Sequence, residues 1–99
     1  MRRTPDEILN TIADKRDMII GFGFRRLGIF GSYARGQESE KSDIDFLVDF
    51  EKPTFDNYFD LKFFLEDLFQ CEVDLVIEDV IKPRIRSHIL KEVVYALGL

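Results

Sequence analysis

Residues 43–50 are the segment that most restricts how this chain can fold. Apolar residues take every second position and acids fill most of the positions between them: Ile44, Phe46, Val48 and Phe50 against Asp43, Asp45 and Asp49. Successive side chains of a strand point to opposite faces, so this alternation predicts a strand over Asp43–Phe50 with one buried face. A strand of this kind needs neighbouring strands and a covering layer of helices.

The rest of the chain alternates between predicted strands and predicted helices. Short apolar runs predict strands over Arg25–Phe30 and Glu72–Ile77. Helix-start signals and apolar spacing predict helices from Pro5 to about Ile20, over Phe55–Phe69, and from Pro83 to a stop at Gly98. The middle helix has the length of a right-handed crossover between parallel strands. The expected fold class is therefore α/β (α+β), a small mixed β-sheet with helices packed on one face.

Length and composition narrow the classes of function. Ninety-nine residues allow one hydrophobic core, so we expect a single domain over residues 1–99 with no room for a second substrate-binding domain. The net charge of −5 argues against a nucleic acid as the main partner. No apolar run reaches the roughly 20 residues that span a bilayer. The single cysteine, Cys71, and the lack of a signal-peptide pattern lead us to expect a cytoplasmic protein.

Three aspartates are candidate metal ligands. Asp43 and Asp45 are two positions apart in the predicted strand, so their carboxylates would share a face, and oxygen ligands suit Mg²⁺. Such a pair by itself is more often simply solvated. Asp74, within the apolar run Val73–Ile77, offers a third carboxylate if the two strands are neighbours in matching register, and cations would then be needed to offset the repulsion. The alternative is an edge acid bonded to a nearby backbone group.

The polar segment between the first two strands begins with a candidate phosphate site. Gly31 and Ser32 follow a strand and precede a helical turn, where backbone N–H groups and a hydroxyl attract anions. Arg35 could pair either with phosphate or with one of the carboxylates. His88 and Cys71 have no companions that would make a zinc site or a thiol catalyst.

The combined pattern resembles the nucleotidyltransferase superfamily of the DNA polymerase β type. Its residues are Gly31, Ser32, Arg35, Gly36, Ser42, Asp43 and Asp45, with Asp74 downstream. More narrowly, nearly the whole chain is similar to the minimal nucleotidyltransferases (MNT), the MntA-like antitoxin proteins often paired with HEPN-domain toxins. The resemblance implies Asp43, Asp45 and Asp74 as catalytic residues and ligands of two Mg²⁺ ions. It also implies that Gly31, Ser32, Arg35 and Ser42 bind the nucleotide.

The resemblance further implies a Mg²⁺-dependent reaction that transfers a nucleoside monophosphate, AMP from ATP, to a partner protein. The acceptor would be a hydroxyl, a tyrosine of a HEPN-type toxin, and the chain would be the antitoxin. One alternative is a binding module that neutralises its partner by occlusion without catalysis. Another is transfer to a small molecule of the aminoglycoside type, which the lack of a second domain disfavours. Aromatic residues around Tyr58, Phe59 and Phe63 are candidates for a partner surface.

Overall fold

A mixed β-sheet forms the centre of the fold. The structure is a computed structural model and describes residues 4–31 and 43–96. The sheet has four strands in the order β3-β2-β1-β4, and β1 runs antiparallel to both β2 and β4 while β2 runs parallel to β3. This confirms the expected small mixed sheet. The strands are β1 (Phe24–Phe30), β2 (Ile44–Phe50), β3 (Val73–Ile77) and β4 (Val94–Tyr95).

The crossover between the parallel strands β2 and β3 is the helix α4 (Phe55–Phe69), which has the predicted bounds. Thr54 caps its N-terminus, because the Thr54 hydroxyl accepts a hydrogen bond from the Asn57 N–H at 3.1 Å. At the other end, Gln70 takes a left-handed conformation with φ 54° and ends the helix. The local sequence therefore fixes both ends of α4.

The N-terminal helical segment has a break that the sequence does not predict. Thr4 caps α1 (Pro5–Asp14) by accepting from the Glu7 N–H at 3.1 Å. Lys15, with φ −101° and ψ 9°, separates α1 from α2 (Arg16–Ile19), and a 3₁₀ turn, η1 (Ile20–Phe22), follows. The helical segment thus starts at the predicted residue but consists of three short pieces.

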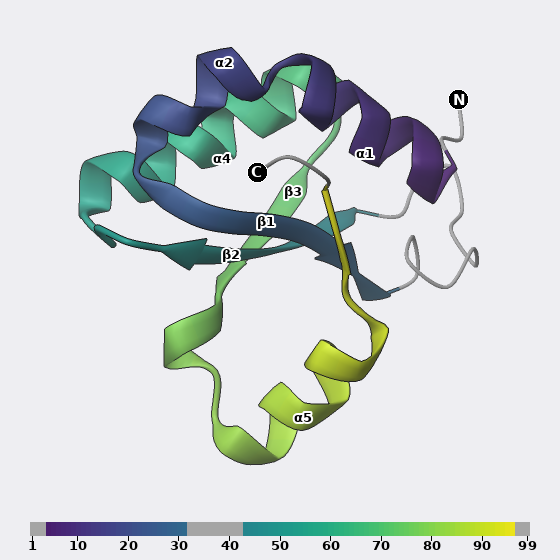
Figure 1. Ribbon diagram of the computed structural model, residues 1–99, viewed down its shortest axis with the longest axis vertical. Coiled ribbons are helices and arrows are strands. Elements are labelled where there is room, and N and C mark those ends of the chain that lie inside the picture. The colour runs from purple at the N-terminus through teal and green to yellow at the C-terminus, as the bar shows by residue number, and fades with distance from the viewer. Residues whose placement is uncertain (1–3, 32–42, 97–99) are drawn as a thin grey trace.

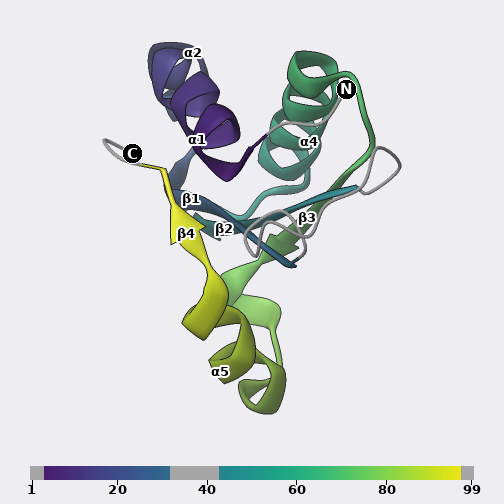
Figure 2. The same cartoon turned by 90° about the vertical axis from the view of Figure 1, so that its right-hand side faces the viewer.

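The hydrophobic core lies between one face of the sheet and the helices α1, α2 and α4 (Figures 1 and 2). The face of β2 predicted to be buried supplies four of its side chains. The helices contribute mainly isoleucine and leucine. Fully buried members from these elements are Ile44, Phe46, Val48, Phe50, Ile8, Ile12, Ile19, Leu61, Leu65 and Phe69.

The C-terminal segment differs from the prediction of one helix up to Gly98. Helix α5 (Pro83–Glu92) ends earlier, and Val94–Tyr95 form β4, which pairs with the outer edge of β1. β-Branched and aromatic side chains favour a strand, and the open edge of β1 supplies the hydrogen-bond partners, so tertiary pairing outweighs helical spacing here. The predicted helix end was therefore wrong.

Helix α5 lies on the opposite side of the sheet from the other helices (Figure 2). A 3₁₀ turn, η2 (Glu78–Val80), leads from β3 towards it, and none of the side chains of α5 is fully buried. We call the sheet face on the α5 side the second face. None of the helices in the described ranges is long and apolar enough to cross a membrane.

Candidate functional site

Asp45 and Asp74 lie side by side on neighbouring strands. The two residues are paired in the parallel register of β2 and β3, one position after Ile44 and Val73. Paired residues of adjacent strands are about 4.8 Å apart and point to the same face, so both carboxylates leave the sheet on the second face. Asp45 is half-buried and Asp74 is exposed. The two strands are therefore neighbours in the matching register that would bring Asp45 and Asp74 together.

Asp43 comes directly before β2, and its side chain is exposed. Its position two residues before Asp45 places it at the same end of the sheet. Its role as a ligand stays a prediction, because Ile44 is the first residue of the strand and Asp43 takes no part in the pairing with β3.

Gly31 directly follows β1 and lies against one of these two carboxylates. Its φ of +74° is in the left-handed region, which side chains other than glycine rarely adopt. A Cβ added at Gly31 would also collide with Oδ2 of Asp45. Because Phe30 and Asp45 are paired across β1 and β2, the chain leaves the sheet with the Asp45 carboxylate against its backbone. The first residue of the proposed phosphate segment and one proposed metal ligand are therefore in contact.

The other predicted nucleotide-binding residues lie outside the described residues. These are Ser32, Arg35 and Ser42, together with Gly36 of the same motif. Their roles stay predictions.

The donor chemistry fits Mg²⁺. Carboxylate oxygens are hard ligands, and Mg²⁺ takes one or two protein carboxylates and completes its octahedron with phosphate oxygens and water. Within residues 4–31 and 43–96, no group of three or more His, Cys, Asp or Glu side chains is arranged to hold a metal ion by itself. The adjacent pair Asp45 and Asp74 matches the smaller number of protein ligands that Mg²⁺ uses, and Gly31 has no Cβ that would displace the Asp45 carboxylate.

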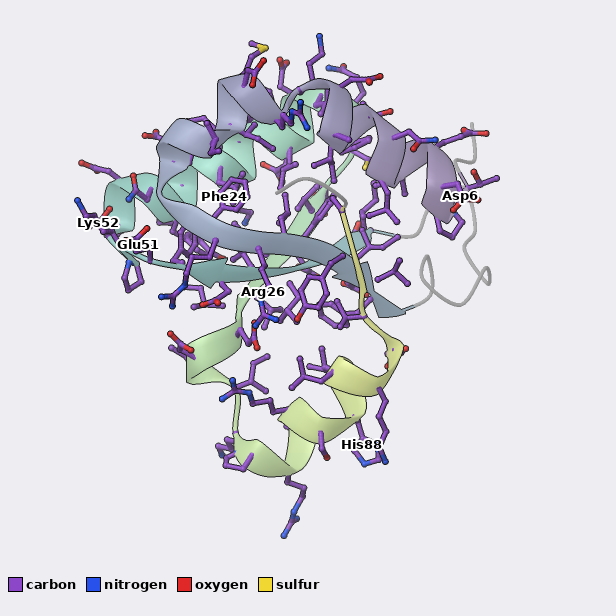
Figure 3. The ribbon with its side chains drawn as sticks, viewed as in Figure 1. Asp6, Phe24, Arg26, Glu51, Lys52 and His88 are labelled. Atoms are coloured by element: carbon purple, nitrogen blue, oxygen red, sulfur yellow. The ribbon has the colours of Figure 1, made fainter. Side chains whose placement is uncertain are left out.

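A cluster of charged residues that the sequence does not indicate lies further along the second face. Glu78 is 3% exposed, and Arg26 of β1 donates to both of its carboxylate oxygens, at 3.0 and 3.1 Å. Arg86 of α5 donates to the same carboxylate at 3.4 Å, and Arg26 lies 3.7 Å from Asp49. Figure 3 shows Arg26 on the α5 side of the sheet. Nothing in the sequence distinguishes Glu78 from its exposed neighbour Asp79.

Tyr95 of β4 completes this cluster. Its ring lies 4.9 Å from the Arg26 guanidinium carbon, and it packs over Gly28, where an added Cβ would come within 3.0 Å of the ring. The Tyr95 hydroxyl is buried and has no hydrogen-bond partner among the described residues. Burial raises the pKa of the Tyr95 phenol, and the negative charge of Glu78 raises this pKa further.

His88 is remote from the carboxylates. It is exposed on α5, and Figure 3 shows it pointing away from the sheet.

Comparison with known proteins identifies the family. Residues 22–96 match the sequence family described as the nucleotidyltransferase domain. The chain belongs to this family. This nucleotidyltransferase is 44% identical over 84 residues to the protein adenylyltransferase MntA of Thermococcus cleftensis, and the match covers 84% of this chain and 85% of that relative. The resemblance to MntA-like proteins stated from the motifs is thereby confirmed.

Solved structures confirm the minimal nucleotidyltransferase fold. One described as a minimal nucleotidyltransferase superposes with a TM-score of 0.72 at 37% identity, over 87% of this chain and 93% of that chain. Another is a tri-AMPylated HEPN toxin of Shewanella oneidensis in complex with an MNT antitoxin. It matches with a TM-score of 0.67 at 18% identity, over 97% of this chain and 74% of that chain, and at this identity the likeness shows the fold alone.

Proposed function

We propose that this nucleotidyltransferase transfers AMP from ATP to a tyrosine hydroxyl of a HEPN-domain toxin in a Mg²⁺-dependent reaction, and so acts as the antitoxin. The observation that carries the proposal is the convergence of Asp45, Asp74 and Gly31 at one end of the sheet. The name of the Thermococcus relative, a protein adenylyltransferase, supports AMP as the group transferred. The Shewanella complex, whose HEPN toxin is AMPylated, supports the class of partner.

In this proposal the acceptor oxygen forms a bond to the α-phosphorus of ATP as the bond from that phosphorus to the bridging oxygen of pyrophosphate breaks. Asp43, Asp45 and Asp74 would hold two Mg²⁺ ions, which neutralise charge on the reacting phosphates when bound. Asp74, which is exposed on an edge strand, would orient the acceptor hydroxyl or take its proton. Gly31, Ser32, Arg35 and Ser42 would bind the triphosphate, with Gly31 allowing the phosphate to approach the backbone.

We further propose that residues 1–99 act as a single nucleotidyltransferase domain and that the partner protein supplies the acceptor. The reaction would take place in the cytoplasm, which provides ATP and keeps the thiol of Cys71 reduced.

The test is transfer of label from α-³²P ATP to the product of the neighbouring reading frame, which we expect to be a HEPN-domain protein, with Mg²⁺ present. We expect a labelled partner, and mass spectrometry should place the AMP on a tyrosine. Asp45→Asn should reduce the rate by at least about 100-fold, as expected for loss of an electrostatic group at the reacting phosphates. Asp14→Asn, an exposed acid on α1, is the matched control and should retain the rate. An unlabelled partner with the wild-type protein, or equal rates for wild type and Asp45→Asn, would contradict the proposal.

The second candidate function, neutralisation by occlusion, is favoured by the exposed aromatic side chains of α4, among them Phe55 and Phe63. A double variant, Asp43→Asn with Asp45→Asn, separates the two. Under the enzymatic proposal this variant binds the toxin but fails to protect cells that express it. Full protection by the double variant would favour occlusion.

A further inference from the structure

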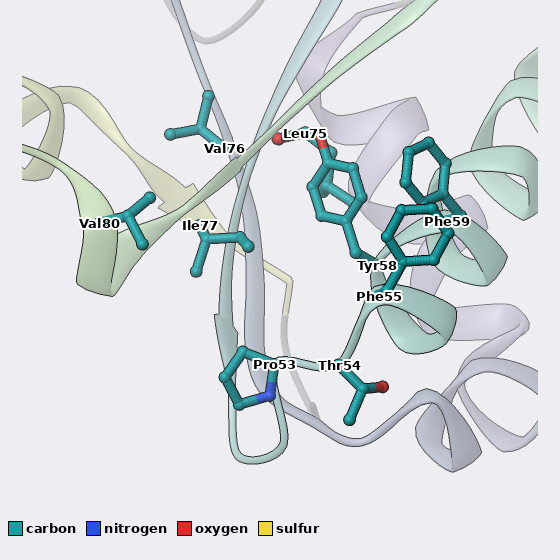
Figure 4. Close-up of a pocket in the computed structure, with 9 residues that line it drawn as sticks. All are labelled: Pro53, Thr54, Phe55, Tyr58, Phe59, Leu75, Val76, Ile77 and Val80. Carbon is teal, nitrogen blue, oxygen red and sulfur yellow. Dashed lines mark hydrogen bonds between the residues drawn. The ribbon is translucent and has the colours of Figure 1, made fainter.

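A hollow of about 500 Å³ lies between α4 and β3. Phe55, Tyr58 and Phe59 of α4 form one wall, and Val76, Ile77 and Val80 line the other side (Figure 4). The hollow is open to solvent, and apolar side chains form most of its walls. Such a concave apolar surface is the usual form of a binding site.

The α4 wall continues outward as a ridge of phenylalanine side chains. Phe55, Phe59 and Phe63 are spaced four residues apart, with ring centroids 4.5 and 5.7 Å from one ring to the next. Phe55 is 76% exposed and Phe63 is 59% exposed, and Val80 across the hollow is 73% exposed. Contiguous exposed apolar surface of this kind marks a site of interaction with another molecule.

The edge of β3 restricts how a partner can bind here. β3 is an edge strand of the described sheet, but α4 side chains already bond two of its outward backbone groups. The Tyr58 hydroxyl donates to the Leu75 carbonyl at 2.9 Å, and the Val73 N–H donates to the Glu66 carboxylate at 3.3 Å. These contacts block addition of a further strand along Val73–Leu75. A partner must therefore bind through side chains that enter the hollow.

Charged residues of both signs surround the hollow. They are the exposed acids Asp56, Asp60 and Asp79, the exposed Lys52 and Lys82, and the half-buried Lys62. The rim therefore has no dominant sign of charge, and the apolar walls are the feature that a partner would recognise.

The hollow reaches the face of β3 that carries the candidate active site. Val76, which lines the hollow, lies two positions after Asp74, so both side chains leave the strand on the second face. We propose that the hollow and the phenylalanine ridge are the docking site of the acceptor protein, which inserts an apolar side chain. This inference rests on the proposed function, and it assigns to α4 and β3 the binding of the protein whose hydroxyl meets Asp74.

The experiment measures, by titration calorimetry, binding of the product of the neighbouring reading frame, the HEPN-domain protein expected under the proposed function. Phe55→Ser and Val80→Ser each remove an exposed side chain from the hollow and should weaken binding at least about tenfold, as expected for anchors at the centre of an interface. Met18→Ser, at a residue of α2 that is 61% exposed, is the matched control and should leave the dissociation constant within about twofold. Circular dichroism and ATP binding should be the same for all three variants.

A second measurement uses the transfer reaction. In transfer assays, Phe55→Ser should raise the KM for the partner and leave kcat at saturating partner unchanged.

The outcomes separate this inference from the proposed function. A wild-type protein that binds the partner without transferring AMP contradicts the proposed function, and the dissociation constants of the variants still decide the docking site. Equal affinity of wild type, Phe55→Ser and Val80→Ser overturns the docking site even where transfer occurs. A wild-type dimer that Phe55→Ser converts to a monomer, with affinity for the partner kept, assigns the hollow to a second copy of this chain and also overturns it. Absence of any binding to the wild-type protein contradicts both proposals.

Discussion

Gly31 combines a backbone conformation that favours glycine with a contact to the candidate site. It has a left-handed φ, and its Cα is packed against the Asp45 carboxylate. The sequence motif predicted that Gly31 belongs to the phosphate-binding segment. The pairing of β1 with β2 shows in addition that a side chain at this position would collide with Asp45. Alanine would have to adopt a conformation that costs it about 1–2 kcal/mol and would displace the carboxylate as well.

We expect Gly31→Ala to lower the free energy of unfolding by at least about 1 kcal/mol and to weaken ATP binding in the presence of Mg²⁺. Urea denaturation and calorimetry measure the two effects. Gly21→Ala is the control, because a Cβ there meets no atom within 4 Å, and its stability should stay close to that of the wild type. Unchanged ATP binding in Gly31→Ala would separate this glycine from the nucleotide site.

At the scale of elements, α5 is held to the sheet by the charged cluster around Glu78. The helix buries none of its own side chains fully, and Arg86 joins it to the sheet by donating to the Glu78 carboxylate that Arg26 of β1 also bonds. Sequence spacing predicted the start of α5 at Pro83 correctly. The position of the helix depends on pairs between residues far apart in the chain, and spacing carries no information about such pairs.

Replacing Glu78 with Gln removes the charge that both arginines share and keeps the size of the side chain. We expect a loss of about 2 kcal/mol of unfolding free energy, typical of a buried hydrogen bond to a charged group, and faster amide hydrogen exchange in residues 81–92. Hydrogen exchange with mass spectrometry and urea denaturation check this prediction. Asp79→Asn, the exposed acid of the same turn, should change neither quantity. Equal exchange in both variants would show that α5 is attached by other contacts.

At the scale of the whole molecule, stability should fall at high pH because of Tyr95. The folded protein holds the phenol neutral, since burial and Glu78 raise the pKa of Tyr95 above its ordinary value of 10.0. In the unfolded chain the phenol ionises at that ordinary value. The contribution of Tyr95 is therefore full below about pH 10 and is lost as the pH rises through the higher folded pKa.

Tyr95→Phe should remove the part of the loss of unfolding free energy above pH 10 that comes from the Tyr95 phenol. At pH 7 the variant should be as stable as the wild type or more stable by up to about 1 kcal/mol, because the buried hydroxyl has no hydrogen-bond partner among the described residues. Urea denaturation of both proteins from pH 7 to pH 11 measures the difference, which isolates Tyr95 from other groups that titrate there. If the unfolding free energies of the wild type and of Tyr95→Phe fell equally between pH 10 and pH 11, the assignment of this loss to Tyr95 would be wrong.

The sequence by itself determined the strand over residues 44–50, its buried face, the bounds of α4 and the family. Alternation, helix caps and motif spacing are local, and each depends on residues only a few positions apart. The tertiary structure decided the pairing of Asp45 with Asp74, the contact of Asp45 with Gly31, and the strand β4 in place of the end of a helix. It also decided that Glu78 is buried while Asp79 is exposed. These features depend on which distant segments meet, because burial and pairing energies arise only when the sheet is assembled.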